Sequence, residues 1–261
     1  MVNEIKNAIV TGAGRNAGIG AEICRTLAKN GINIYFTSYE YYDMSVADIS
    51  KEDYKKTLDE CKEYGVNAFF AIYNLTKNSE IVRLFDEAEN KMGNIDILIN
   101  CSCYHIHDDI LKVSEEILDD NFSINAKSVM LLCREFYSRF LGKDGRIINF
   151  SSTQNLEALT TEISYAISKA SVPIIVSTLA PIMASKGITI NAVNPGATDV
   201  GDIHDKNIHE YIGSNKFSRL GLPSDAANLV QFLVSDAGKW ITGQTINSEG
   251  AICRGLMKDG N

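Results

Sequence analysis

Short apolar runs alternate with longer amphipathic segments along most of this chain. One apolar run, Ile95–Cys101, is hydrophobic at most positions, which indicates a strand buried on both faces. The longer segments carry apolar residues at helical spacing and polar residues on the opposite face. Strands that alternate with helices form right-handed βαβ units, so the pattern predicts an α/β fold with a doubly wound, mostly parallel, seven-stranded sheet and helices on both faces. The expected strands are Ile5–Val10, Ile32–Thr37, Ala68–Tyr73, Ile95–Cys101, Arg146–Ser151, Ile188–Val193 and Thr245–Asn247, and the expected helices are Ile19–Asn30, Lys51–Tyr64, Ser79–Met92, Ser114–Phe140, Glu162–Lys186 and Ser224–Ser235.

A chain of 261 residues without internal repeats or a Pro/Gly-rich linker favours a single domain over residues 1–261. After Pro195 the alternation breaks, and the polar segment 199–218 is expected either to cover a substrate as a lid or to be a solvated surface loop. The net charge of −8 argues against nucleic acid or an anionic membrane as a partner. No apolar run suits a signal peptide or a membrane span, and the six cysteines form no paired framework, so a reducing cytoplasm is the expected location.

The first expected strand runs into a glycine-rich segment, Thr11–Gly20, which a helix follows. Glycine lets a backbone turn tightly and approach a pyrophosphate, which then lies at the positive N-terminus of the helix. Glycine-rich turns also occur for purely steric reasons, but the position between the first strand and the first helix favours a Rossmann-type dinucleotide site. The expected cofactor contacts in this segment are Gly12, Gly14, Arg15, Asn16, Gly18, Ile19 and Gly20.

The end of the second expected strand bears on the choice between the two nicotinamide cofactors. A site that grips an unphosphorylated ribose is expected to place a carboxylate there. This strand ends in Thr37 and Ser38, and the next acidic residue is Glu40. The two hydroxyls and the cation of Arg15 suit a 2′-phosphate, so NADP(H) is favoured. NAD(H) stays open, because Arg15 also fits a solvated loop cation.

A serine, a tyrosine and a lysine form the predicted catalytic group. Ser152 follows the expected strand Arg146–Ser151, and Tyr165 and Lys169 stand at positions i and i+4 of one helix, hence on one face. An ammonium beside a phenol favours the phenolate and lowers the pKa of the tyrosine from about 10. Such a tyrosine can protonate a carbonyl oxygen while hydride reaches the carbon, and the serine hydroxyl can hydrogen-bond the same oxygen.

With these motifs the chain resembles the short-chain dehydrogenase/reductase superfamily over nearly its whole length. Its C-terminal segments Arg219–Asp225 and Trp240–Gln244 closely resemble those of 3-oxoacyl-carrier-protein-reductase-like members. The resemblance carries a catalytic tetrad onto Asn125, Ser152, Tyr165 and Lys169, with Asn121 as the less suitable asparagine. It implies that Asn125 holds a water linking Lys169 to solvent, and that Lys169 also binds the nicotinamide ribose. Further cofactor contacts implied by the resemblance are Asn74, Leu75, Asn100, Cys101, Ser102, Tyr165, Pro195, Gly196 and Thr198.

Three departures from the superfamily's usual pattern bear on the cofactor site. The glycine loop reads Gly-x5-Gly-x-Gly, two residues longer than the common Gly-x3-Gly-x-Gly, a lengthening shared with enoyl reductases of the superfamily. Those enzymes typically use Tyr-x6-Lys, whereas Glu162 stands seven residues before Lys169, which argues against that activity. The usual Asn-Asn-Ala-Gly segment is here Asn100–Cys103, and the aspartate that often contacts adenine is Asn74. A bulkier cofactor wall and altered adenine binding are therefore expected.

The predicted reaction is hydride transfer between nicotinamide and a carbonyl or secondary alcohol, with Tyr165 as general acid/base. By resemblance, a 3-oxoacyl thioester or similar ketone is the first substrate candidate, whereas sugars, steroids, quinones and small alcohols stay open. The alternative is a catalytically silent dinucleotide-binding sensor or scaffold, which the altered cofactor wall suggests and the intact tetrad argues against. The expected substrate contacts are Tyr104, Ser152, Gln154 and Tyr165. His105, Leu159 and the segment 199–218 are also expected to line the pocket.

The expected macromolecular partners rest on the resemblance. It implies a homotetramer in which the helices at 114–140 and 162–186 pair with their copies. Lys143 and Lys186 lie where related reductases carry basic residues for an acyl-carrier protein, although lysines at such positions are often simply solvated.

No metal site is expected from the sequence. Cys101 and Cys103 could bind an ion, but the sequence is interpreted as offering no further cysteine or histidine nearby at ligand spacing. His107, His204 and His209 are interpreted as loop residues outside the catalytic tetrad.

Overall fold

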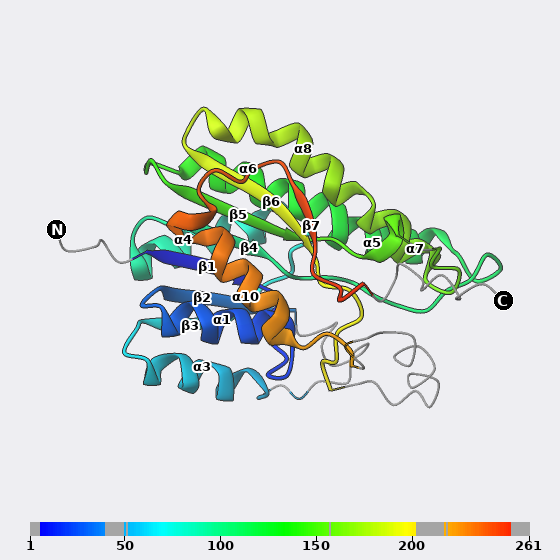
Figure 1. The fold of residues 1–261 in the computed structure, drawn as a ribbon, viewed down its shortest axis with the longest axis horizontal. Helices are drawn as coiled ribbons and strands as arrows, with labels where there is room; N and C mark the ends of the chain where they lie inside the picture. Colours follow the sequence, from blue (N-terminus) through cyan, green and yellow to red (C-terminus); the bar gives the residue numbers. More distant parts are fainter. Residues whose placement is uncertain are drawn as a thin grey trace.

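The structure, a computed structural model, describes residues 6–39, 50, 52–156, 158–201, 217 and 219–251. Strands and helices alternate through most of this length, as the hydrophobic pattern predicts (Figure 1). The strands are β1 (Asn7–Thr11), β2 (Asn33–Ser38), β3 (Ala68–Ile72), β4 (Ile97–Asn100), β5 (Gly145–Phe150), β6 (Ile188–Asn194) and β7 (Thr245–Asn247). The helices are α1 (Ile19–Lys29), α3 (Tyr54–Glu63), α4 (Asn78–Met92), α5 (Glu115–Phe122), α6 (Val129–Arg139), α7 (Ile163–Lys169), α8 (Ser171–Ala184) and α10 (Pro223–Val234), with a π-helical turn η1 (Ser123–Ser128) and two 3-10 turns, η2 (Thr153–Asn155) and η3 (Asp236–Gly238).

All seven strands pair in parallel, in the order β3-β2-β1-β4-β5-β6-β7. Helices α4, α6 and α8 lie on one face of this sheet, and α1, α3 and α10 lie on the other (Figure 1). The predicted doubly wound, Rossmann-type α/β fold is thereby confirmed. The strand order reverses between β1 and β4, so the segments that follow these two strands lead to opposite faces, which is where open parallel sheets bind ligands.

The two apolar cores explain why the middle positions of the central strands are hydrophobic on both faces. In β1, Ala8 and Val10 belong to the core beneath α1 and α10, whereas Ile9 belongs to the core beneath α4, α6 and α8. All three side chains are fully buried. Successive side chains of a strand point to opposite faces, so a strand covered on both faces needs apolar residues throughout.

Two helices that the periodicity predicts as continuous are interrupted. The segment 114–140 is divided into α5, the π-helical turn η1 and α6, and the segment 162–186 is divided at Ala170 into α7 and α8. The backbone stays near helical dihedrals through both breaks, with φ −60° and ψ −19° at Ala170, so hydrophobic spacing does not reveal them. Most of the predicted lid, residues 202–216 and 218, lies outside the described residues, as does the predicted helix start at Lys51.

Together α7 and α8 form a stretch, Ile163–Ala184, that could cross a membrane by length and composition alone. The expectation that no apolar run has the length and composition of a membrane span was therefore wrong. One side of the stretch, including Val172, Val176 and Met183, is buried in the core against the sheet. The core helix of a globular protein passes the same test, so this single stretch is weak evidence for a membrane span.

A buried ion pair holds the amino end of β5. Arg146 is fully buried, and its Nη1 lies 2.6 Å from Oδ1 of Asp144 and donates to the carbonyl of Gly145. Lys6 donates to the other oxygen of Asp144 at 2.8 Å. Burial alone would raise the pKa of Asp144, but the hydrogen bonds from Lys6 and Arg146 outweigh it and lower this pKa to about 2. The carboxylate compensates a guanidinium that is costly to bury by itself.

We expect the substitution Asp144→Asn to lower the free energy of unfolding at pH 7 by about 3 kcal/mol, because it leaves Arg146 buried without its counter-ion. The pKa of Asp144 is lower in the folded chain than in the unfolded chain. Its stabilisation is therefore complete above about pH 4 and is lost as the pH falls towards about 2. Urea unfolding at pH 7 and pH 3 measures both effects.

Lys6→Met is the matched control, because it removes the partly exposed partner of the same carboxylate. We expect it to cost no more than about 1 kcal/mol. A loss for Asp144→Asn no larger than that for Lys6→Met would contradict the assignment.

Candidate functional site

The glycine-rich loop joins β1 to α1 at the point where the strand order reverses. Gly12 has a φ of +70°, and a Cβ atom on it would lie 2.6 Å from backbone atoms of Ser102. A Cβ atom on Gly20 would lie 2.5 Å from the carbonyl oxygen of Gly12. Side chains do not tolerate such distances, so both positions require glycine. The two glycines bring the loop, the first turn of α1 and the segment after β4 into direct contact.

The extra residues between Gly12 and Gly18 form a turn, and polar contacts hold this turn in place. The backbone N–H of Gly18 donates to the carbonyl of Arg15 at 2.9 Å. Arg25 of α1 donates to both the carbonyl and the side-chain oxygen of Asn16, and the N–H of Asn16 donates to Asp53 at 2.6 Å. Asn16 therefore fastens the loop to α1 and to the start of α3, and Arg15 lies half-buried in the turn.

The segment after β4 forms a wall beside the glycine loop. The hydroxyl of Thr11 accepts from the N–H groups of Cys101 and Ser102 at 3.2 and 3.3 Å. Asn100 donates to the side chain of Asn149 on β5 at 2.7 Å. Burial, reinforced by the neighbouring Cys103, raises the pKa of Cys101 to about 12, so its sulfur stays a neutral thiol. The bulkier wall expected from the sequence is therefore built of packed, uncharged groups.

The end of β2 offers hydroxyls in a buried position. The carbonyl of Thr37 accepts from Ala13 in the glycine loop at 2.8 Å, which places the two segments side by side. Thr37 and Ser38 are both buried, and Oγ1 of Thr37 has no hydrogen-bond partner among the described residues. Tyr39 follows, and Glu40 lies outside the described residues.

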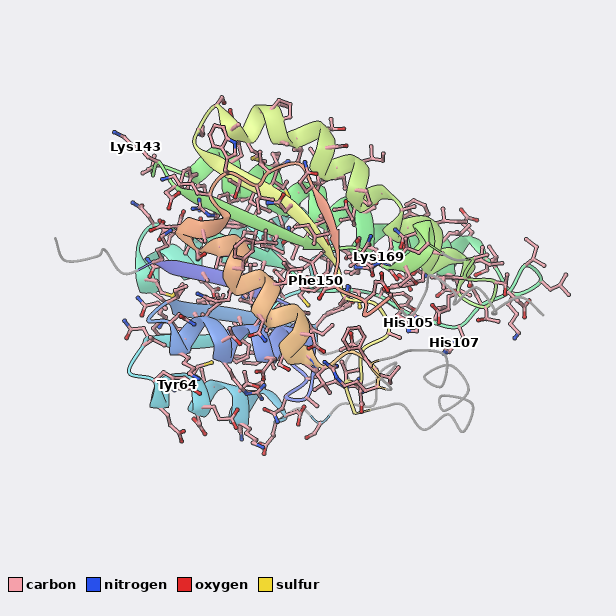
Figure 2. The ribbon with its side chains drawn as sticks, viewed as in Figure 1. Tyr64, His105, His107, Lys143, Phe150 and Lys169 are labelled. Carbon is pink, nitrogen blue, oxygen red and sulfur yellow. The ribbon has the colours of Figure 1, made fainter. Side chains whose placement is uncertain are left out.

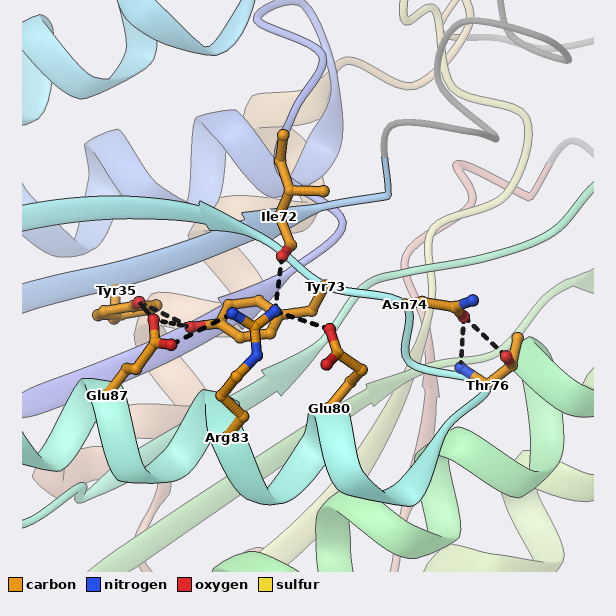
Figure 3. A network of polar contacts seen from close by, with 8 residues as sticks. All are labelled: Tyr35, Ile72, Tyr73, Asn74, Thr76, Glu80, Arg83 and Glu87. Atoms are coloured by element: carbon orange, nitrogen blue, oxygen red, sulfur yellow. Dashed lines mark hydrogen bonds and ion pairs between the residues drawn. The ribbon is translucent and has the colours of Figure 1, made fainter.

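Asn74 follows β3 and forms a local turn. Its side-chain oxygen accepts from the N–H and the hydroxyl of Thr76 at 3.1 and 2.7 Å (Figure 3). Just before it, the Tyr73 hydroxyl donates to Glu87 at 2.6 Å, and this bond is the leading cause that lowers the pKa of Glu87. Leu75 is buried in the core. Because the turn uses the amide oxygen of Asn74, the amide nitrogen is the atom that can donate to a ligand.

Lys169 and Tyr165 share one face of α7, as their spacing predicts. Lys169 is buried, and its Nζ donates to the carbonyl of Phe150, the last residue of β5, at 2.8 Å. The same Nζ lies 5.9 Å from the centre of the Tyr165 ring. Burial lowers the pKa of Lys169, while the thiols of Cys103 and Cys101 oppose that shift. Figure 2 shows Lys169 and Phe150 close together at the carboxyl end of the sheet.

Asn125 lies in the π-helical turn η1, a feature that often marks functional sites. Its side chain is fully buried, accepts from the N–H of Tyr104 and donates to the carbonyl of the same residue, both at 2.8 Å. It also contacts the hydroxyl of Ser168, the neighbour of Lys169, at 2.9 Å. Asn121 lies beside it at 3.3 Å. Asn125 therefore joins the segment after β4 to the helix that carries Tyr165 and Lys169.

Ser152 lies immediately after β5, in an extended conformation with φ −148° and ψ −174°. Because Lys169 reaches Phe150 two residues earlier, Ser152 and the face of α7 meet at the same edge of the sheet. Ser151 is buried, and its Oγ has no hydrogen-bond partner among the described residues; the same holds for Oε1 of Gln154. Polar atoms buried in this way fit a site that a polar ligand completes.

The segment after β6 supplies the last predicted cofactor contacts. Gly196 has a φ of +66°, and its N–H donates to the side chain of Asn194. The hydroxyl of Thr198 contacts the carbonyls of Pro195 and Gly196 at 3.3 and 3.2 Å. These contacts fold the segment back at the carboxyl edge, the edge at which the glycine loop and Ser152 also lie.

A nicotinamide dinucleotide fits this arrangement. No side-chain hydrogen bond caps α1 within the described part of the chain, so the first N–H groups of the helix can face an anion. The unpartnered hydroxyls of Thr37 and Ser151 lie at the ends of β2 and β5, on either side of the strand-order reversal. The glycine loop and the Asn100–Ser102 wall would hold the dinucleotide between them. The individual contacts remain predictions.

Sequence reasoning places His105 at the substrate pocket but misses the cluster of ionisable groups that it forms beside Tyr165. His105 packs edge-on against the Tyr165 ring, with 4.7 Å between ring centres. Glu162, at the N-cap of α7, lies 3.2 Å from His105 and 3.7 Å from His107. The only signal in the sequence was the spacing of the two histidines, because Glu162 is far away along the chain.

Lys143 and Lys186 lie away from this site. They precede β5 and β6 and therefore stand at the amino edge of the sheet, opposite the edge of Ser152; Figure 2 shows Lys143 far from Lys169. The ammonium of Lys186 donates to the carbonyl of Tyr137 at 2.8 Å. A carrier protein bound at these lysines stays a prediction, and their position gives it no support.

Comparisons with known proteins agree with the fold. The family model described as enoyl-(acyl carrier protein) reductase matches residues 12–250. The uncharacterized oxidoreductase YjdA of Bacillus subtilis is 37% identical over 255 residues, which cover 96% of this chain and 98% of the relative. The 3-oxoacyl-[acyl-carrier-protein] reductase FabG of Staphylococcus aureus is 32% identical, with 95% of this chain and 98% of the relative covered.

A solved structure supports the same fold and enzyme class. The angucycline C-6 ketoreductase LanV, solved with bound NADP, superposes with a TM-score of 0.84 at 27% identity and covers 96% of each chain. The family match and the relatives above 30% identity extend over nearly the whole chain. The chain therefore belongs to the short-chain dehydrogenase/reductase superfamily and is an NAD(P)-dependent oxidoreductase.

Proposed function

We propose that the protein reduces a ketone to a secondary alcohol with NADPH, and that Tyr165 gives the proton to the carbonyl oxygen. The observation that carries the proposal is the buried ammonium of Lys169, which the carbonyl of Phe150 holds beneath the Tyr165 ring. When bound, the cofactor supplies the hydride that reduces the carbonyl carbon. The chain itself has to supply a proton and to orient the carbonyl group.

The phenol of Tyr165 is the proton donor in this proposal. As its O–H bond breaks, a new O–H bond forms on the substrate and the carbonyl becomes an alcohol. The ammonium of Lys169 favours the phenolate that is left behind, and the burial that lowers the pKa of Lys169 also strengthens this attraction. The hydroxyl of Ser152 donates to the same carbonyl oxygen and keeps the carbonyl group oriented toward Tyr165. The phenolate then regains a proton from solvent.

A 3-oxoacyl thioester is the proposed first substrate class. The similarity to a staphylococcal 3-oxoacyl reductase supports it. The similarity to an angucycline ketoreductase supports a bulkier, polycyclic ketone as the competing choice. The family model's description names enoyl reductases, but Glu162 occupies the position at which Tyr-x6-Lys would require a tyrosine. Reduction of a carbonyl rather than of a carbon–carbon double bond is therefore proposed.

We expect Tyr165→Phe to lower kcat for ketone reduction by about 10²- to 10⁴-fold, because it removes the proton donor and leaves the fold intact. NADPH oxidation is followed by absorbance against acetoacetyl thioesters, polycyclic aromatic ketones and small ketones. NADPH binding by calorimetry should be little changed, since the phenol is a small part of the cofactor's contacts.

Tyr64→Phe is the matched control, because Tyr64 is exposed and follows α3, far from Lys169 (Figure 2). It should leave kcat unchanged. Turnover that survives Tyr165→Phe would contradict the role of the phenol. Tight NADPH binding by the unaltered protein with no turnover on any ketone would instead support the silent dinucleotide sensor.

A preference for NADPH over NADH is part of the proposal. The described residues at the end of β2 hold no carboxylate, and the buried hydroxyl of Thr37 is unpartnered there. Arg15 lies half-buried in the neighbouring turn. A cation and a hydroxyl suit a 2′-phosphate, whereas an unphosphorylated ribose is usually held by a carboxylate.

Arg15→Ala should lower kcat/KM for NADPH about 10- to 100-fold and leave kcat/KM for NADH nearly unchanged, because a charge-assisted hydrogen bond contributes about 1.5–3 kcal/mol. Lys29→Ala, which removes an exposed cation at the end of α1, is the control and should change neither value. Equal losses with both cofactors in Arg15→Ala would rule out a contact with the 2′-phosphate.

Assembly into a homotetramer is proposed for the same enzyme. Ile167, Ile174 and Ile182 of α7 and α8 are between 48% and 66% exposed, and Met130 of α6 is exposed as well. Four large apolar side chains on neighbouring helices suit an isologous contact with a second copy. The family resemblance supports the same helices as the interface.

Ile174→Asp should split the assembly, because the contact would have to bury a carboxylate without a partner. Sedimentation velocity at micromolar concentration measures the mass of both proteins. Lys112→Asp, on an exposed loop, is the control for added negative charge. A monomeric mass for the unaltered protein would end the proposal.

A reducing compartment, the cytoplasm, is the proposed location. Cys24, Cys61 and Cys133 are buried free thiols, and Cys101 and Cys103 are free as well. Disulfides are rare in the cytosol and common in exported proteins, so free thiols favour the former. Fractionation of cells that produce the chain tests this assignment, and recovery in a membrane or secreted fraction would contradict it.

A further inference from the structure

We propose that His105, His107 and Glu162 form a binding site for a divalent transition-metal ion, represented by Zn²⁺, beside the catalytic tyrosine. One donor atom from each residue lies within 4.8 Å of the other two. Nε2 of His105 is 3.2 Å from Oε1 of Glu162, and Nδ1 of His107 is 3.7 Å from the same oxygen. The proposal does not depend on the reductase activity, because it concerns binding of the ion alone.

The distances match those that a zinc ion requires. Zinc takes imidazole nitrogens and carboxylate oxygens at about 2.0–2.1 Å in a tetrahedral arrangement, which puts neighbouring donor atoms about 3.3 Å apart. Two of the three separations, 3.2 and 3.7 Å, are close to this value. The third, between the two imidazole nitrogens, is no more than 4.8 Å, so side-chain rotations can bring the three donors onto one ion. Two histidines and one glutamate are also a ligand set that catalytic zinc sites use.

The backbone holds the three residues in this arrangement. His105 and His107 stand two residues apart, and their rings lie edge to face with 5.3 Å between the ring centres; Figure 2 shows the two residues near each other. The next residue, Asp108, forms a β-bridge with Glu162, and its N–H donates to the carbonyl of Thr161 at 3.0 Å. The carboxylate of Asp108 accepts from the N–H and the hydroxyl of Ser164 at the start of α7. The histidine segment is thereby fastened to the residue that supplies the carboxylate.

The charge and exposure of the cluster suit an ion better than a simple ion pair. Glu162 supplies a carboxylate oxygen beside two imidazole nitrogens, and both kinds of donor bind zinc. A single His–Glu pair would need only one imidazole, yet both rings contact the same oxygen. The side chain of His107 is 77% exposed, which gives an ion access from solvent, and three protein ligands leave a fourth position for water.

Zinc binding by the untagged, cofactor-free protein tests the proposal directly. Isothermal titration with ZnCl₂ should give saturable binding of one ion per chain, and Co²⁺ should give the visible spectrum of a tetrahedral site. His107→Ala should weaken Zn²⁺ binding at least tenfold, because loss of a ligand costs at least as much as loss of an outer-shell partner. Glu162→Gln should do the same while it keeps the shape of the side chain.

Two controls separate this site from adventitious binding. Asp109→Asn removes an exposed charge from the same segment, where Asp109 pairs with Lys112, and should leave the affinity unchanged. The double variant His204→Ala, His209→Ala removes the other two histidines of the chain and should also leave it unchanged. No saturable binding to the unaltered protein, or binding that survives both His107→Ala and Glu162→Gln, would overturn the proposal.

Discussion

The hydrogen bond from Lys169 to the carbonyl of Phe150 is the contact on which the candidate active site depends. It ties α7 to the carboxyl end of β5, two residues before Ser152. A buried ammonium is costly, and this carbonyl offsets part of that cost. The bond therefore places a positive charge beneath the Tyr165 ring without a carboxylate, whose negative charge would cancel the effect on the phenol.

A second attachment determines how α7 faces the cofactor wall. Asn125 binds both backbone polar groups of Tyr104 and reaches the hydroxyl of Ser168, so one amide joins the segment after β4 to the helix after β5. The π-helical turn that contains Asn125 interrupts the regular spacing of the helix, and such a turn re-aims the side chains that follow it.

The strands could be predicted because each one is buried on both faces, and the pairing of Tyr165 with Lys169 could be predicted because positions i and i+4 always share a helix face. The breaks at η1 and Ala170 could not, because the backbone stays near helical dihedrals at both and hydrophobic spacing does not record tertiary hydrogen bonds such as those of Asn125. The approach of Glu162 to His105 was also hidden, since the tertiary fold alone brings the two segments together.

The lengthened glycine loop shows how a departure from a family pattern can be absorbed. Gly12 and Gly20 still bring β1, α1 and the wall after β4 into contact, so the extra residues have to leave the path between them. They do so as a turn that Arg25 of α1 clamps at Asn16 and that Asp53, just before α3, holds by the N–H of Asn16. Lys169, in contrast, is held by the carbonyl of Phe150 at the end of β5. The lengthened turn and the Lys169–Phe150 contact are thus attached to different elements, so the sheet can absorb the insertion without a change at β5.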